Sequence, residues 1–267
     1  LLRIRSRFQF SKRRQFVGTT LILTVVLMAT QLDSSGIHPI LLLGLVTLSY
    51  VMSFLVLREN LSGWAYVTTL TLPAYYSGAV YLFYLLLPTR WLTRLPIAML
   101  YSVGIYAILL TENIYNVAAE RNIQLLRAAH SVGFLLTLLT TFFLFDTVVS
   151  LHLPFYLNML LTLVIVFPLE LQALWSMELT PGISRTSLIA AACITLLMVE
   201  LIGVFAFWPI KTTIQALFMT TVFYTLTGMT QQFLVERLFA KTAREFLTVL
   251  GLVFILVIIS TNWGVGQ

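Results

Sequence analysis

Charged residues are scarce in this chain, and their scarcity excludes a soluble globular protein. Only 10% of the 267 residues are Asp, Glu, Lys or Arg, whereas 59% are hydrophobic. Soluble domains carry about 25% charged residues. No stretch has the composition of a soluble domain of ~100 residues. The composition therefore predicts an integral membrane protein, with a basic cytoplasmic segment over residues 1–15 and a single membrane domain over residues 16–267.

Cysteine and the common catalytic signatures are also nearly absent. Cys193 is the only cysteine, so no intrachain disulfide forms, and its place in an apolar run favours a packing role. The sequence holds no HExxH, GxSxG, P-loop or GxGxxG pattern. We therefore expect no metal or other cofactor, and an enzyme is disfavoured. The net charge of +6 comes from residues scattered between apolar runs, which argues against nucleic acid as a partner.

What the chain has instead is long apolar runs. Nine segments approach the ~20 residues that a helix needs to cross a bilayer. Helices are predicted because every backbone polar group in lipid needs a partner. The fold class is therefore an all-α polytopic bundle, and Ser187 is expected to cap its seventh helix. The expected spans cover residues 16–32, 37–57, 64–87, 95–116, 131–151, 154–176, 187–208, 212–235 and 246–263.

The positions of lysine and arginine predict the orientation. With the N-terminus in the cytoplasm, 13 of the 16 basic residues fall in inside segments. Only Arg90, Arg94 and Lys211 fall outside. Because positive residues accumulate on the cytoplasmic side, we predict a cytoplasmic N-terminus and an external C-terminus in the cytoplasmic membrane of the cell.

The most polar long stretch lies between the fourth and fifth spans. On one continuous helix, Glu112, Asn116, Glu120, Arg127 and His130 would lie within about 80° of one another. Asn113 flanks this stripe. Such a stripe is the first candidate for a functional surface.

A helix that ran unbroken through this stretch would be too long for the ~30 Å hydrocarbon layer. We therefore expect residues 117–130 to form a cytoplasmic or interfacial helix. Glu120, Arg121, Arg127 and His130 would then lie near lipid headgroups. Anionic headgroups would be the partners of the two arginines.

Four acidic residues lie within the expected spans, namely Glu112, Asp146, Glu170 and Glu200. A charge at bilayer depth costs ~2.5–3.5 kcal/mol on insertion scales, so such residues are candidates for function. Asp146 lies near a span end, and reaching the interface is its favoured interpretation. For Glu112 the structural alternative is pairing with a nearby arginine, and for Glu170 and Glu200 it is a neutral, hydrogen-bonded carboxyl group. Against each of these, a functional role stays equally open.

Two further patterns support a polar pathway. Pro168 frees the backbone carbonyl of Val164 two residues before Glu170, and broken helices are a common way for transporters to build midplane sites. Span eight carries polar residues on one helical face, which favour either interhelical hydrogen bonds or a pathway shared with Glu170 and Glu200. These residues are Thr213, Thr220, Tyr224, Thr227 and Gln231.

One run of the chain resembles a known family. TENIYNVAAERNIQLLRAAHSVGFLLTLLTTFFLF, from Thr111 to Phe145, is similar to a family of multi-pass membrane proteins from uncultivated bacteria that has no assigned activity. The resemblance implies a bacterial cytoplasmic membrane and adds no mechanism.

Three functions stay open on these observations. The leading hypothesis is transport or permeation of a proton, a cation or a small solute through the intramembrane carboxyl groups. The second is an assembly protein that docks a protein partner, or a second copy of the chain, through residues 117–130. The third is a lipid-modifying enzyme at the inner leaflet that uses Glu112, Glu120, Arg127 and His130.

Overall fold

The protein is built from helices alone in the part of the chain that the structure describes. The structure, a computed structural model, describes residues 12–30, 37–58, 63–87, 91–118, 123–180 and 182–261. Each expected span overlaps one helix, so the predicted all-α class is confirmed for these residues. The helices are α1 (Lys12–Thr30), α2 (His38–Leu57), α3 (Ala65–Leu85), α4 (Trp91–Ala118), α5 (Ile123–Ser150), α6 (Phe155–Glu178), α7 (Arg185–Phe205), α8 (Thr212–Leu234) and α9 (Ala240–Ser260).

Local sequence explains several helix ends. Pro39 stands in the first turn of α2, where its missing N–H costs nothing. The cap of α7 is Ser184, whose side-chain oxygen accepts a hydrogen bond from the Ser187 backbone N–H at 3.0 Å. The expected cap at Ser187 is therefore wrong by one turn. α6 ends at Leu179, which has a left-handed φ of 49° and stops the helix.

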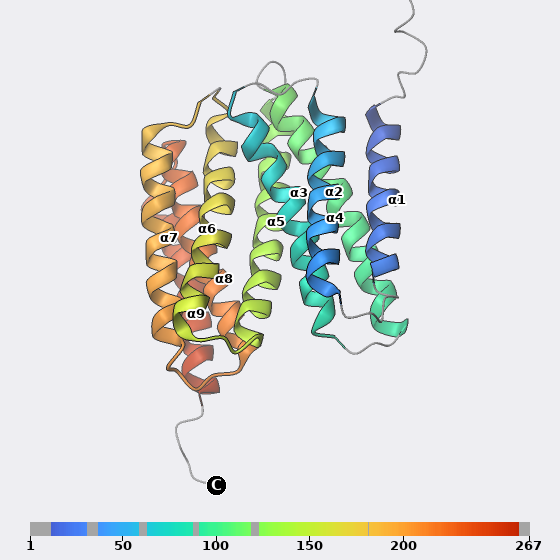
Figure 1. Cartoon of the computed structure of the whole chain (residues 1–267). Coiled ribbons are helices and arrows are strands. Elements are labelled where there is room, and N and C mark those ends of the chain that lie inside the picture. Colours follow the sequence, from blue (N-terminus) through green and yellow to red (C-terminus); the bar gives the residue numbers. More distant parts are fainter. Residues whose placement is uncertain are drawn as a thin grey trace, which may run out of the picture.

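Consecutive helices run up and down side by side (Figure 1). The start of α1 and the end of α9 consequently lie at opposite ends of the bundle. α3 packs against α2, α4, α5 and α6, while α5 packs against α3, α4, α6 and α8. These two helices form the centre of the bundle.

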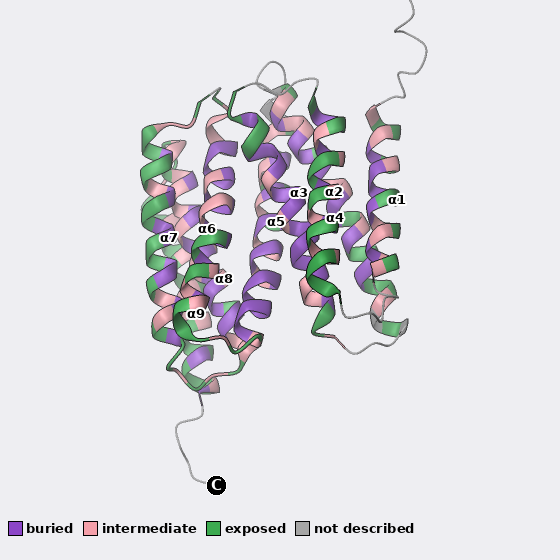
Figure 2. Ribbon diagram, viewed as in Figure 1, coloured by how far each residue is buried: buried purple, intermediate pink, exposed green. Residues whose placement is uncertain are grey.

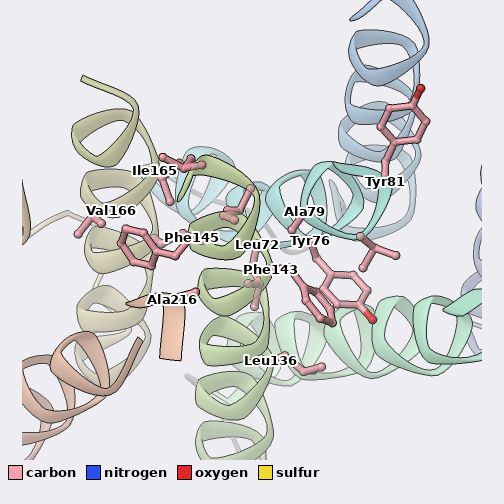
Figure 3. Packing of buried hydrophobic residues seen from close by; sticks show 14 of the residues in the cluster. Leu72, Tyr76, Ala79, Tyr81, Leu136, Phe143, Phe145, Ile165, Val166 and Ala216 are labelled. Carbon is pink, nitrogen blue, oxygen red and sulfur yellow. The ribbon is translucent and has the colours of Figure 1, made fainter. Parts of the chain in front are cut away.

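The main apolar core lies where α3, α5, α6 and α8 face one another (Figure 3). Phe143 of α5 stacks on Phe83 of α3 with ring centroids 4.4 Å apart. Phe145 and Val166 are buried on the other side of α5, towards α6. In lipid this packing stabilises the fold through van der Waals contact, because the lipid chains are as apolar as the core.

Six of the described helices are long and apolar enough to cross a membrane, namely α2, α4, α5, α6, α7 and α9. The outer helices α2, α7 and α9 carry much of the exposed surface, whereas α3 and α5 are largely buried (Figure 2). Large apolar side chains such as Leu196 of α7 and Leu252 of α9 are exposed on this surface. A surface of this kind suits lipid and not water, so we treat the chain as a helical membrane protein.

Candidate functional site

The second half of α6 is the place where polar side chains from three other helices meet. Glu112 of α4, His130 of α5, and Thr227 and Gln231 of α8 each share a hydrogen bond with α6. Polar groups between membrane helices are commonly paired in this way. The α6 partners fall between residues 170 and 176, which is less than two helical turns. α6 is therefore the element around which the polar interior is organised.

Glu112 is fully buried, and its carboxyl group is bound by an amide of α6. The Gln172 Nε2 group donates to Glu112 Oε1 at 2.9 Å. Glu112 Oε2 and Gln172 Oε1 are also buried, and neither has a hydrogen-bond partner. Buried polar atoms in native proteins are nearly all paired. A proton on the Glu112 carboxyl group would give these two unpaired oxygens a donor, because a protonated carboxyl group has one O–H.

His130 faces α6, and its neighbours come from the α4–α5 pair. Its Nε2 lies 2.8 Å from the carbonyl oxygen of Ser176, and because a carbonyl only accepts, this nitrogen carries the hydrogen. The ring of Tyr115 lies beside it at 5.4 Å between centroids, and the Tyr115 hydroxyl donates to the Ala129 carbonyl at 3.0 Å. A Cβ at Gly133 would overlap that hydroxyl. The glycine thus lets α4 and α5 approach closely enough to place His130.

Glu170 is the second fully buried carboxyl group, and it faces α8. The Thr227 hydroxyl donates to Glu170 Oε2 at 2.6 Å, while Glu170 Oε1 is buried without a partner. One helical turn away, Gln231 Nε2 donates to the Ala173 carbonyl at 2.9 Å. The described hydrogen-bond donors to Glu112 and Glu170 are therefore uncharged, and each carboxyl group keeps one free oxygen.

The carbonyl that Pro168 frees is occupied by a side chain from another helix. The Tyr75 hydroxyl of α3 donates to the Val164 carbonyl at 2.8 Å. This is the carbonyl four residues before the proline, as the sequence predicts. The sequence alone does not identify its donor. The hydrogen bond ties the middle of α6 to the central helix α3.

Glu170 and Glu200 do not share one pathway in this structure. Glu170 is 0% exposed inside the bundle, whereas Glu200 lies on the exposed face of α7. Their expected convergence is therefore wrong. Asp146 is buried near the far end of α5, with one carboxylate oxygen unpaired, and does not join the α6 cluster.

The polar residues of the α8 stripe do not share one environment. Thr227 and Gln231 reach α6 as described above. Tyr224 packs between aromatic rings of α5 and α9. Thr220 returns its hydrogen bond to its own helix, and Thr213 is exposed. Only the end of the stripe nearest the Glu170 carboxyl belongs to the polar cluster.

The expected stripe between residues 112 and 130 is not one helical face. α4 ends at Ala118, and α5 begins at Ile123. Residues 123–130 are the first turns of α5 and do not form a helix of their own. Arg127 is exposed there, while the expected sites Glu120 and Arg121 lie outside the described residues.

Two amides of α4 lie near the polar cluster without joining its hydrogen bonds. Asn113 and Asn116 are both partly exposed. The Asn116 Nδ2 atom is buried and has no partner. Among the described polar residues that follow Glu112 on α4, this is the one buried donor without a hydrogen-bond partner.

Three members of the cluster were not predicted, because the sequence patterns singled out the acidic residues within spans, the polar stripe between residues 112 and 130, and the polar face of span eight. Gln172, Tyr115 and Ser176 provide an amide, a ring and a backbone carbonyl to it. Gln172 carried a usable signal, because an amide two residues after Glu170 in an apolar span also needs a partner. Tyr115 and Ser176 carried none, since their roles depend on which helices are neighbours. In the described part of the chain, no group of three or more His, Cys, Asp or Glu side chains is placed to hold a metal ion.

Six long apolar helices and an apolar outer surface in the described part of the chain define its class as a helical protein of the membrane type. The chain belongs to the protein family of unknown function DUF5656, whose model matches residues 66–260. No curated protein and no solved structure matches the chain. The match includes the run from Thr111 to Phe145, and the expected membership of a family without an assigned activity is confirmed.

Proposed function

We propose that this protein conducts or transports a proton, alone or coupled to a cation or small solute, and that Glu112 and Glu170 carry the proton. The observation that supports the proposal is the free oxygen on each of these fully buried carboxyl groups. A carboxyl group at this depth is costly to insert. One that only joined helices would have its hydrogen-bonding capacity filled. A carboxyl group that has one free oxygen and uncharged hydrogen-bond donors is suited to gain and lose a proton.

The proposal includes a membrane topology. Nine helices that alternate in direction, with the described chain ends on opposite sides (Figure 1), agree with nine spans. We place the N-terminus in the cytoplasm and the C-terminus outside, in a bacterial cytoplasmic membrane. The positions of lysine and arginine support this orientation. Arg127, which is exposed at the start of α5, would then contact anionic headgroups of the inner leaflet.

Movement is needed for transport, because both carboxyl groups are sealed from the surface in this structure. α6 is suited to it, since Pro168 removes one of its backbone hydrogen bonds. Rearrangement of a helix broken in this way is a common basis of alternating access. The Tyr75–Val164 hydrogen bond holds the sealed state.

The test uses purified protein in liposomes that contain a pH-sensitive dye, with a potassium gradient and valinomycin to drive protons. Glu112→Gln and Glu170→Gln keep the shape and the existing hydrogen-bond acceptor. We expect each to lower proton flux at least about tenfold, equivalent to ~1.4 kcal/mol in the barrier. Glu200→Gln is the matched control, because Glu200 lies on the exposed face of α7, and its flux should match the wild type.

Two results together would overturn the proposal. The first is a flux that is unchanged in both buried Gln variants. The second is failure of a carboxyl-reactive carbodiimide to modify Glu112 or Glu170 in the native protein. The assembly function would then be favoured over transport. The lipid-modifying function has less support, because His130 is already engaged by the Ser176 carbonyl.

A further inference from the structure

A cavity lies at the end of the bundle away from the Glu112 cluster. It has a volume of about 360 Å³, which is within the ~300–1,000 Å³ range of small-molecule sites. Its walls come from the α5–α6 connection and the α7–α8 connection, including Phe205, Phe207 and Trp208. Both connections lie at the lower end of the bundle in Figure 1. The cavity belongs to neither carboxyl site.

Asn158 of α6 lines this cavity and carries an unpaired acceptor. Its side chain lines the cavity and is only 8% exposed. The amide nitrogen donates to the Leu153 carbonyl at 3.3 Å, which fixes the amide orientation. Its oxygen, Oδ1, is buried and has no hydrogen-bond partner. A buried acceptor of this kind normally has a donor, and a ligand held in the cavity that Asn158 lines could supply one.

The other polar groups in the wall also favour a donating ligand without charge. His152 has a left-handed φ of 48°, a costly conformation that often marks a functional site. Its Nδ1 lies 2.8 Å from the Ser150 carbonyl and so carries the hydrogen. Gln215 of α8 adds a buried amide. No Asp, Glu, Lys or Arg is among the described residues that line the cavity.

The aromatic wall supplies the apolar half of the site. Phe205 and Trp208 stack with ring centroids 5.3 Å apart. Phe207 and Trp208 also border a second hollow of about 330 Å³, lined in addition by Val204, Pro209 and Thr261. An amphiphile could therefore place a polar head beside Asn158 and extend an apolar portion along these rings.

We infer that this cavity binds an uncharged amphiphilic alcohol, whose hydroxyl group donates to Asn158 Oδ1 and whose apolar part packs against Phe205, Phe207 and Trp208. Two sources share this chemistry, a free aromatic alcohol and a neutral glycerolipid. The second hollow gives an acyl chain room to extend. The inference is independent of the proton pathway, because it uses none of the carboxyl groups.

The test uses the full chain in phosphatidylcholine nanodiscs and a long-chain alkanol that carries a photoreactive diazirine. After illumination, mass spectrometry maps the labelled residues. We expect the label to concentrate on residues 205–210 and 152–158. Ala206→Phe fills the cavity without removing a hydrogen bond and should lower labelling about tenfold, and Asn158→Leu should lower it by a similar factor.

Ala192→Phe is the matched control, because Ala192 is an exposed alanine on α7 that does not line the cavity. Its labelling should equal that of the wild type. Competition identifies the source, since 2-phenylethanol should displace the label if a free alcohol binds and monooleoylglycerol if a lipid binds. Displacement by neither competitor, label spread evenly over the lipid-facing helices, or full labelling of a folded Ala206→Phe variant would each overturn the inference.

Discussion

α5 and α9 are similarly apolar, and α9 is slightly the more apolar of the two. They nevertheless differ in burial, because α5 is mostly buried and α9 is mostly exposed. Within the membrane-crossing part of each helix, 67% of the residues are buried in α5 and 6% in α9. α5 packs against four helices, whereas α9 packs mainly against α8. Apolar character therefore identifies a helix that can cross a membrane without telling whether it faces protein or lipid.

Small and hydroxyl-bearing residues distinguish the two helices. Gly133, Thr137, Thr140 and Thr141 of α5 are all buried, whereas Thr248 of α9 is exposed. Small residues let helices approach closely, and close approach is the main source of stability when lipid competes with protein for apolar contact. The difference teaches that buried small and hydroxyl-bearing residues, and not overall apolar character, distinguish the central helix from the outer one.

The largest expected effect comes from removing an aromatic ring from each helix. Phe143 of α5 is buried and stacks on Phe83, so Phe143→Ala should lower the free energy of unfolding by ~3 kcal/mol. Phe254 of α9 is exposed, and Phe254→Ala should cost less than ~1 kcal/mol, because lipid replaces much of the lost contact. Unfolding by SDS titration in bicelles measures both. Equal losses would show that α9 is as well packed as α5.

The next effect compares a glycine in each helix. A Cβ at Gly133 would overlap the Tyr115 hydroxyl, while a Cβ at Gly251 of α9 would meet nothing within 4 Å. Gly133→Ala should cost ~2 kcal/mol, because Tyr115 must move away from the Ala129 carbonyl. Gly251→Ala should be neutral or stabilising by up to ~1 kcal/mol, since alanine favours the helix. The same titration tests the pair, and a destabilised Gly251→Ala variant would contradict the exposed position of α9.

A smaller effect concerns the attachment of α9 to the bundle. Gly228 of α8 lies against the ring of Phe246 of α9, and a Cβ there would overlap that ring. Gly228→Ala should therefore loosen α9 while lowering global stability by only ~1 kcal/mol. Hydrogen exchange read by mass spectrometry should rise in α9 and stay unchanged in α5. A rise in both helices would show that α9 supports the core.

The smallest effect comes from matched threonines. Thr137 of α5 and Thr248 of α9 each donate to a carbonyl of their own helix, at 3.0 Å and 2.7 Å. Thr137→Val should change stability by ~0.5 kcal/mol, because valine keeps the shape and loses one weak net hydrogen bond. Thr248→Val should be silent within error. A loss above ~2 kcal/mol at Thr137 would reveal a partner on another helix.

Sequence alone predicts much of this architecture. Helix number and class follow from apolar runs of sufficient length, whereas the cap of α7 was expected at Ser187 and lies one turn earlier, at Ser184. The excessive length of a continuous helix predicted a break near residue 117, but the start of α5 at Ile123 was not predicted, because no proline or glycine marks it in the sequence. The helix periodicity fits a continuous helix equally well.

The candidate site was predictable only in part. Glu112 and Glu170 stand out because acids are rare in apolar spans, and the freed Val164 carbonyl follows from Pro168. The periodicity of one helix does not specify which of its faces meets a neighbouring helix. Glu200 therefore looked equivalent to Glu170, although Glu200 lies on the outside of the bundle. Its position depends on tertiary packing, which single-sequence patterns do not encode.

α6 carries Asn158 near its first turn and Gln172 near its last, with the Tyr75–Val164 hydrogen bond between them. The alcohol cavity therefore adjoins one half of α6 and the Glu112 carboxyl group contacts the other half, with the Tyr75 hydrogen bond between the two. If alcohol binding favours one angle between the two halves, reciprocity requires that protonation of the carboxyl group change the affinity for the alcohol by the same factor. A ligand with equal affinity for both angles would shift neither half. Removing the Tyr75 hydroxyl would then change the coupling between alcohol binding and carboxyl protonation more than it changes either of them alone.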